Sequence, residues 1–204
     1  ILPSAGPVDG GTIIEVHGSG LGGGVGATPD YQCRFYSVVV PAVIATATTG
    51  LHILRCTSPA QNASSMPLEV SLNAQEATEQ GLRFVSYSNP IVSEMTPQRG
   101  PRGGGTQISI FGLHLNGADT RCGFTSLNGS SLLVPAIYSF HMDCLLCRVP
   151  EGARSRIAVS PDALHLFPSS TDFNYFDEPS LQELSPSSGP VLGGTQVTVT
   201  GANI

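Results

Sequence analysis

A ten-residue pattern occurs three times in this chain, and it constrains the fold more than any other feature. The pattern is P-x-x-G-P-x-x-G-G-T, and its copies begin at Pro3, Pro97 and Pro186. Self-similarity at a fixed period, here about 90 residues, indicates an array of similar structural units. We therefore expect tandem copies of one small domain and not a single large fold.

Each copy of the pattern runs into a segment in which apolar and other residues alternate. Alternation with a period of two is typical of a β-strand that buries one face. The prolines and glycines just before it are expected to bend the chain into that strand. In the two complete copies the residues expected to face the core are Ile14, Val16, Ile108 and Ile110.

The complete copies share further landmarks, which set the expected domain boundaries. Each has a C-x-F sequence followed by a C-x-x-P sequence, and each closes on an aromatic segment that precedes a proline, at residues 84–87 and 173–176. We expect two complete domains over 1–88 and 89–178, and the start of a third over 179–204. The short join at Asn89-Pro90 is expected to limit bending between the first two domains, because proline restricts the backbone.

Composition excludes several classes of protein. The 204 residues include 24 Gly and 16 Pro, which suits short strands joined by tight turns. A hydrophobic share of 40% supports a packed core. All nine basic residues are Arg against 15 acidic residues, so the net charge of −6 provides no basic surface for nucleic acid. Without Lys, neither a P-loop nor a lysine Schiff base is available. The sequence also contains no apolar run of the roughly 20 residues that a membrane span needs.

Taken together, these motifs resemble the IPT/TIG domain family. The resemblance rests on the G-P-x-x-G-G-T opening, the alternating strand, the C-x-F and C-x-x-P sequences and the closing F-x-Y strand, and it covers all three copies. It implies an all-β chain of tandem immunoglobulin-like sandwiches with about seven strands per domain. The family occurs in plexins, in related receptor ectodomains and in some transcription factors. Tandem copies, acidic charge and paired cysteines favour the extracellular branch.

Within this family resemblance, each complete copy is expected to hold one disulfide. The expected pairs are Cys33–Cys56 and Cys122–Cys147. Disulfides persist in oxidising compartments, so these pairs imply an extracellular or cell-surface location. Asn62-Ala-Ser64 and Asn128-Gly-Ser130 are N-glycosylation sequons, and in a secreted protein Asn62 and Asn128 are candidate glycan acceptors.

The fifth cysteine, Cys144, lies three residues before Cys147 in a His141-x-x-Cys-x-x-Cys sequence. That triplet is a candidate zinc or redox site, but it lacks a second ligand pair and a surrounding βαβ unit. Along a regular strand an odd separation turns two side chains to opposite faces. Cys144 is therefore expected to point outward if Cys147 points inward. It is a candidate either for a disulfide to another chain or for a shielded free thiol.

Other sequence patterns are weaker. Gly18-Ser-Gly-Leu-Gly-Gly23 satisfies G-x-G-x-x-G, but more glycines and Pro29 follow where a nucleotide-binding helix would begin. A calcium site using Asp9, Asp30 or Glu94 would need a loop dense in ligands, and none is evident. The sequence predicts no cofactor, no metal and no catalytic residue.

The leading functional interpretation is a non-enzymatic extracellular segment of a longer tandem-repeat protein. It would act as a spacer or as a surface for other protein chains or neighbouring repeats. The alternative is the stalk of a plexin-like receptor ectodomain. Two further alternatives are a transcription-factor module, which requires a basic flanking domain and reduced cysteines, and an accessory domain of a secreted carbohydrate enzyme.

Overall fold

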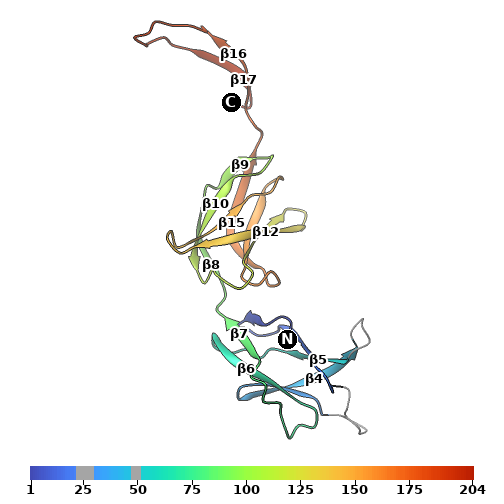
Figure 1. The fold of residues 1–204 in the computed structure, drawn as a ribbon. Helices are drawn as coiled ribbons and strands as arrows, with labels where there is room; N and C mark the ends of the chain where they lie inside the picture. Colours follow the sequence, from blue (N-terminus) through green and yellow to red (C-terminus); the bar gives the residue numbers. More distant parts are fainter. Residues whose placement is uncertain (22–29, 47–51) are drawn as a thin grey trace.

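The structure is a computed structural model that describes residues 1–21, 30–46 and 52–204. In this part of the chain every regular element is a β-strand. Figure 1 shows two curled sheets that follow one another along the molecule, with a separate hairpin beyond the second. Over the same residues no helix is long and apolar enough to cross a membrane.

The first sheet, here called the first sandwich, has seven strands within the described residues, in the order β1-β7-β6-β3-β4-β5-β2. Strands β1 and β7 pair in parallel, and the other neighbours are antiparallel. The strands are β1 (Ala5–Pro7), β2 (Ile13–His17), β3 (Gln32–Phe35), β4 (Val38–Thr46), β5 (His52–Thr57), β6 (Ser64–Ser71) and β7 (Arg83–Tyr87).

The second sheet, the second sandwich, repeats this order with one additional edge strand, β8 (Ile91–Thr96). Its order is β8-β10-β13-β12-β11-β14-β15-β9, so β9 to β15 correspond to β1 to β7. The other strands are β9 (Arg99–Pro101), β10 (Gln107–Leu113), β11 (Arg121–Ser126), β12 (Ser131–Ser139), β13 (Cys144–Arg148), β14 (Ser155–Ser160) and β15 (Phe167–Phe176). The all-β, immunoglobulin-like expectation is confirmed.

The last hairpin, β16 (Ser180–Ser185) with β17 (Thr198–Ala202), has the same arrangement as β8 with β10. In both pairs the register shifts beside a glycine, Gly112 or Gly201. A Cβ on either glycine would collide with the backbone of the partner strand, at Ile91 or Ser180. The third copy of the sequence motif therefore begins to fold as the second one does.

One long strand in each sandwich connects its two layers. Strand β4 pairs with β3 up to Pro41 and with β5 from Ala42 onward, and β12 changes partner at Pro135 and Ala136. Proline lacks an N–H donor, so it fits where a strand leaves one ladder and enters the next. The V-P-A sequence at both positions is a second repeated signature, and it marks where the sheet folds over on itself.

The repeated motif makes a tight turn between the first two strands of each sandwich. Gly10 and Gly104 have φ of 74° and 77°, in the region that favours glycine. A Cβ on Gly10 would lie 2.6 Å from the backbone nitrogen of Ala60. Any other residue would therefore be strained at this φ and would also collide with that backbone. The motif threonine follows the turn and is buried, with 3% of Thr12 exposed.

The strand phase expected from the sequence is correct. Ile14, Val16, Ile108 and Ile110 are all buried in the two cores. In the first sandwich an edge-to-face pair of aromatic rings, Phe35 and Phe84, packs at 5.7 Å between centroids. The neighbouring residues Glu15 and His17 lie on the outer face, where Glu15 forms an ion pair with Arg55.

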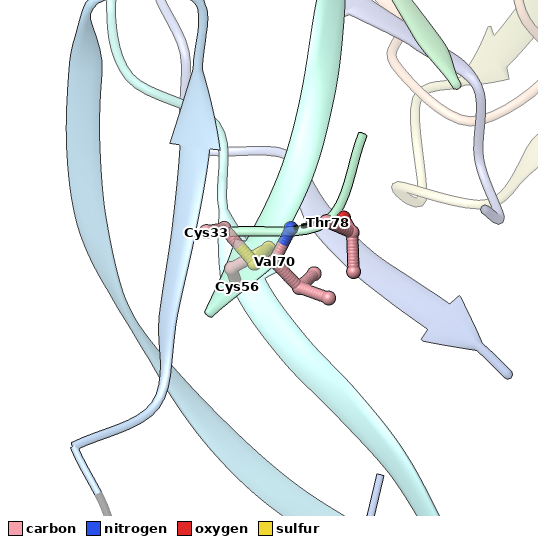
Figure 2. The surroundings of a disulfide bond; sticks show 4 residues. All are labelled: Cys33, Cys56, Val70 and Thr78. Carbon is pink, nitrogen blue, oxygen red and sulfur yellow. Dashed lines mark hydrogen bonds between the residues drawn. A yellow bond between two sulfur atoms is a disulfide. The ribbon is translucent and has the colours of Figure 1, made fainter. Parts of the chain in front are cut away.

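Each sandwich contains one disulfide between its two layers. Cys33 of β3 bonds to Cys56 of β5, and Cys122 of β11 bonds to Cys147 of β13. The Cα atoms are 6.3 Å and 6.5 Å apart, within the range that a disulfide spans. Figure 2 shows the first bond beside Val70, whose backbone N–H donates to the hydroxyl of Thr78.

Cys144 lies on the opposite face of its strand from Cys147, as expected from the sequence, but it is not exposed there. Cys144 is a free cysteine, but its exposed fraction is 0%. The parity argument holds, because Leu145 and Cys147 belong to the core cluster and Cys144 does not. Exposure does not follow from parity, since β13 is an inner strand between β10 and β12 and Cys144 is paired with Ser139 of β12. The structure thus agrees with a shielded free thiol and disfavours a disulfide to another chain.

Candidate interdomain junction

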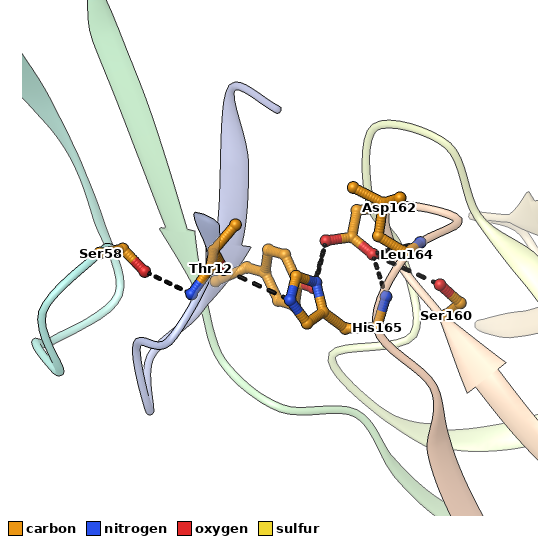
Figure 3. Close-up of polar contacts among 7 residues, drawn as sticks. Thr12, Ser58, Ser160, Asp162, Leu164 and His165 are labelled. Atoms are coloured by element: carbon orange, nitrogen blue, oxygen red, sulfur yellow. Dashed lines mark hydrogen bonds and ion pairs between the residues drawn. The ribbon is translucent and has the colours of Figure 1, made fainter. Parts of the chain in front are cut away.

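A polar cluster between distant parts of the sequence lies where the two sandwiches meet. It joins the end of β7 and the motif turn of the first sandwich to the 161–166 loop between β14 and β15. Figure 3 shows Asp162 and His165 of this loop on the side that faces Thr12 and Ser58 of the first sandwich. We call this cluster the junction.

The 161–166 loop presents Asp162 in a fixed orientation. Its Oδ1 accepts hydrogen bonds from the backbone N–H of Leu164 at 3.0 Å and of His165 at 2.9 Å. This is the Asx-turn pattern, in which an aspartate bonds to the backbone just after it. The Ser160 hydroxyl contacts the same oxygen at 3.4 Å. Oδ2 is thereby directed at the first sandwich, and only 6% of the side chain is exposed.

Tyr87, at the end of β7, is the main contact from the first sandwich. Its hydroxyl donates to Asp162 Oδ2 at 2.7 Å. Its ring also meets Phe167 of β15 edge-to-face at 6.4 Å between centroids. One side chain therefore makes both a polar and an apolar contact across the junction.

His165 extends the cluster to the motif threonine. Its Nδ1 lies 2.7 Å from Asp162 Oδ2, and because a carboxylate only accepts, Nδ1 carries the proton. In the neutral ring Nε2 is then an acceptor, and it faces the Thr12 hydroxyl at 3.4 Å. The backbone N–H of Thr12 donates to the Ser58 hydroxyl at 3.0 Å, which fixes the threonine.

The junction shifts the pKa of two of its groups. Burial alone would raise the pKa of Asp162, but the hydrogen bonds from His165, Tyr87 and Leu164 outweigh it and the pKa lies below its usual value. Burial and the hydrogen bond to Asp162 raise the pKa of Tyr87 above its ordinary value. Asp162 is thus ionised and Tyr87 neutral at physiological pH, the pair of states that this hydrogen bond requires.

The linker adds one more contact beside the junction. The Asn89 side-chain amide donates to Asp9 Oδ2 at 2.6 Å, and Asp9 lies in the motif turn. Pro90 follows immediately and restricts the backbone. The linker is thereby tied to the first sandwich on the side from which the second begins.

The corresponding positions at the end of the second sandwich differ. Tyr87 is paired with Pro7 in β1, and Phe176 is paired with Pro101 in β9, so the two aromatic residues are equivalent. Ser58 is likewise replaced by Val149, as their matching bonds to the motif glycines show. Neither replacement carries a hydroxyl. The hydrogen bonds of the junction therefore have no counterpart at the end of β15.

Sequence reasoning placed Tyr87 and Thr12 in repeated motifs but did not connect them, and it missed Asp162 and His165. The P-D-x-L-H sequence does carry a turn signal, since aspartate followed by a loop favours an Asx-turn. What that turn faces is a tertiary property. The candidate glycan acceptors Asn62 and Asn128 are both exposed and take no part in the hydrogen bonds of the junction.

The other candidate residues are not brought together. Asp9, Asp30, Glu94 and His141 are all exposed. Cys147 forms a disulfide with Cys122 and is not free to bind a metal. Within 1–21, 30–46 and 52–204, no group of three or more His, Cys, Asp or Glu side chains is arranged as a metal site. Of the 18–23 glycine sequence, residues 18–21 are described, and Gly22 and Gly23 lie outside the described residues.

A family model described as IPT/TIG domain matches residues 1–86, the range that forms the first sandwich. Residues 1–86 form an IPT/TIG domain. The second sandwich repeats its motif, its strand order and its disulfide, and the hairpin repeats its opening. The second sandwich therefore shares the architecture of residues 1–86.

Known relatives match the chain along its whole length. Plexin-B3 from Homo sapiens is 27% identical over 207 residues, which is 100% of this chain and 10% of the plexin. A solved structure of the full extracellular region of plexin A4, domains 1 to 10, has a TM-score of 0.54 at 18% identity. It covers 99% of this chain and 19% of that one. The chain therefore spans only a small part of each relative, and it shares the fold of the matched part of that extracellular region.

Proposed function

We propose that this chain is part of the extracellular stalk of a plexin-like receptor, in which IPT/TIG domains act as non-catalytic spacers. The stalk is a specific form of the extracellular structural segment expected from the sequence. Support comes from the identity with Plexin-B3 along the full chain and from the disulfide in each sandwich. Disulfides of this kind belong to an oxidising compartment.

The units of this spacer are proposed to be residues 1–88, 89–178 and 179–204. The last is the beginning of a third IPT/TIG domain. Their partners are in the first place the neighbouring domains of the same chain. A receptor stalk has to hold the other domains of the receptor at a defined distance and angle. Its function therefore depends on the contacts between successive units.

The junction is the observation that carries this proposal. Tyr87, Asp162, His165 and Thr12 form a connected set of hydrogen bonds between two successive sandwiches. Interfaces between domains are usually mobile unless specific contacts hold them. The carboxylate of Asp162 is held in place by donors of its own sandwich, so rotation of either sandwich would break the hydrogen bond that Tyr87 donates to it.

Small-angle X-ray scattering of the 204-residue chain tests the proposal. The wild type is expected to scatter as one extended shape, and Tyr87→Phe is expected to broaden the range of maximum dimensions. Tyr138→Phe is the matched control, because it removes a tyrosine–aspartate hydrogen bond, to Asp143, that lies within the second sandwich. Wild-type scattering typical of two freely jointed bodies would contradict a spacer of fixed angle.

A further inference from the structure

A groove opens at the end of the first sandwich where β3 turns into β4. Its apolar lining includes Phe35, Tyr36, Val38 and Pro67, and Asn62 of the first sequon lies in the same lining. Asn62 precedes β6 by two residues and is exposed. The groove therefore lies directly beside a candidate glycan acceptor.

Tyr36 is an unusual residue at this place. It is 74% exposed although it is large and aromatic, and its φ is 52°, in the left-handed region that non-glycine residues seldom adopt. Its backbone N–H donates to the Pro67 carbonyl at 3.1 Å, which holds the turn over β6. Tyr36 and Ser37 form the two-residue turn between β3 and β4, and the first position of such a turn needs positive φ, which small residues adopt more readily than tyrosine.

We propose that this groove seats the first N-acetylglucosamine of an N-linked glycan on Asn62, with the sugar packed against the Tyr36 ring. The inference rests on the proposed extracellular function, since the glycan is added in the secretory pathway. In that reaction the Asn62 amide nitrogen bonds to C1 of the sugar, loses a proton and displaces a lipid pyrophosphate. The glycan is then tethered next to the groove, so its effective concentration there is high.

Polar groups in the lining match the acetamido group of this sugar. Gln61, the residue before Asn62, has a buried Nε2 with no acceptor among the described residues. A buried donor without a partner costs free energy, and an acetamido carbonyl is an acceptor of the required kind. Arg83 is held on the rim by hydrogen bonds to Ser65 Oγ at 2.8 Å and Ser65 O at 2.6 Å.

The second sandwich supplies a natural comparison. A groove at its corresponding end follows β11, and its lining has no aromatic ring: Thr125, Ser126, Leu127, Arg154, Arg156 and Asp172. The second sequon lies beside it, because Asn128 adjoins Leu127 in the turn between β11 and β12. The two sequons thus occur at equivalent ends of the two sandwiches, but only the first has an aromatic ring beside it.

The test uses the 204-residue chain secreted from mammalian cells, trimmed enzymatically to one N-acetylglucosamine per site. Asn128→Gln isolates the Asn62 sugar, and Asn62→Gln isolates the Asn128 sugar as the control. Proton NMR is expected to show the acetamido methyl of the Asn62 sugar shifted upfield by the Tyr36 ring current. The shift is expected to persist in Tyr36→Phe and to vanish in Tyr36→Asn, a residue that also tolerates positive φ.

Urea unfolding of the same samples gives a second readout. Complete removal of the Asn62 sugar is expected to favour unfolding roughly five-fold in the equilibrium constant, the size of one aromatic contact. This effect is expected to disappear in Tyr36→Asn but to remain in Val43→Ala, which alters an exposed β4 residue outside the groove.

The outcomes separate this proposal from the proposed function. The secreted chain can form both disulfides and yet leave Asn62 unoccupied, or carry an Asn62 sugar whose methyl signal is not shifted. Either result overturns only the proposal that the groove binds the sugar. Free thiols at Cys33 and Cys56 in the secreted chain overturn the extracellular function and the sugar seat with it.

Discussion

In the second sandwich Gly100 packs directly against Thr106. A Cβ placed on the glycine would lie 2.3 Å from the threonine Oγ1. The same relation holds between the first motif glycine and the motif threonine in the other two copies. The close approach of the threonine side chain thus explains why a glycine recurs six positions before it. In the sequence motif nothing links the two residues, but in the fold their atoms pack against each other.

Gly100→Ala is therefore expected to destabilise the second sandwich by about 1–3 kcal/mol, the range for overpacking a filled site. Urea unfolding measures the change. Gly152→Ala is the control, since a Cβ there would meet only Tyr175 at an ordinary distance of 3.6 Å. Equal stability of the two variants would show that the threonine does not fill this space.

The core position of Ile110 gives a second prediction. Ile110→Ala is expected to reduce the free energy of unfolding by about 2–4 kcal/mol, because it leaves a cavity between the layers. Ile137→Ala, on an outward position of β12 that is largely exposed, is the matched control and is expected to change stability little. A loss below about 0.5 kcal/mol for Ile110→Ala would mean that the site is not a packed core position.

The disulfides give a third prediction. Replacing Cys122 and Cys147 together by Ala is expected to lower the stability of the second sandwich by about 3 kcal/mol, because the bond restricts the unfolded chain. Thermal unfolding of wild type and variant measures the difference. Peptide mapping without reductant checks the connectivity, and recovery of Cys122 or Cys147 as a free thiol would contradict the pairing.

Cys144 is expected to be inert in the folded protein. Its thiol is buried, so a thiol reagent is expected to label it only after denaturation, and non-reducing electrophoresis is expected to show a monomer. Cys144→Ala is expected to leave the electrophoretic pattern unchanged. Rapid labelling of the native chain at Cys144 would show that the strands flanking β13 do not cover it.

The junction is expected to weaken in acid. The folded-state pKa of Asp162 lies below its ordinary value, so the junction stabilises the folded chain above the pKa of an unfolded aspartate, about 3.9. That contribution is lost as pH falls through the lower folded-state pKa. Scattering measured between pH 7 and pH 2 is expected to show a broader range of shapes at the acid end. Asp162→Asn is expected to remove this pH dependence, and an identical pH response in the variant would assign the effect to other groups.

Most of the fold was predictable from the sequence because it depends on local patterns that occur more than once. Alternation around Ile14 and Ile108 determines which face is buried, and the motif glycines specify turns that other residues cannot adopt. The two cysteines of each copy also lie in the same motifs, C-x-F and C-x-x-P, although 23 residues separate them in one copy and 25 in the other. Strand identity and core phase therefore followed from local spacing, and the cysteine pairs followed from the repeated motifs together with the family resemblance.

Tertiary structure decided the features that depend on which surfaces meet. Parity places Cys144 on the outer face, but only the flanking strands of β13 make it buried. Asp162 and His165 look like ordinary loop residues, and they acquire a role because the second sandwich places them against Tyr87 and Thr12. A period of two residues specifies the direction of a side chain relative to its own strand. It carries no information about a neighbour that lies 75 residues away along the chain.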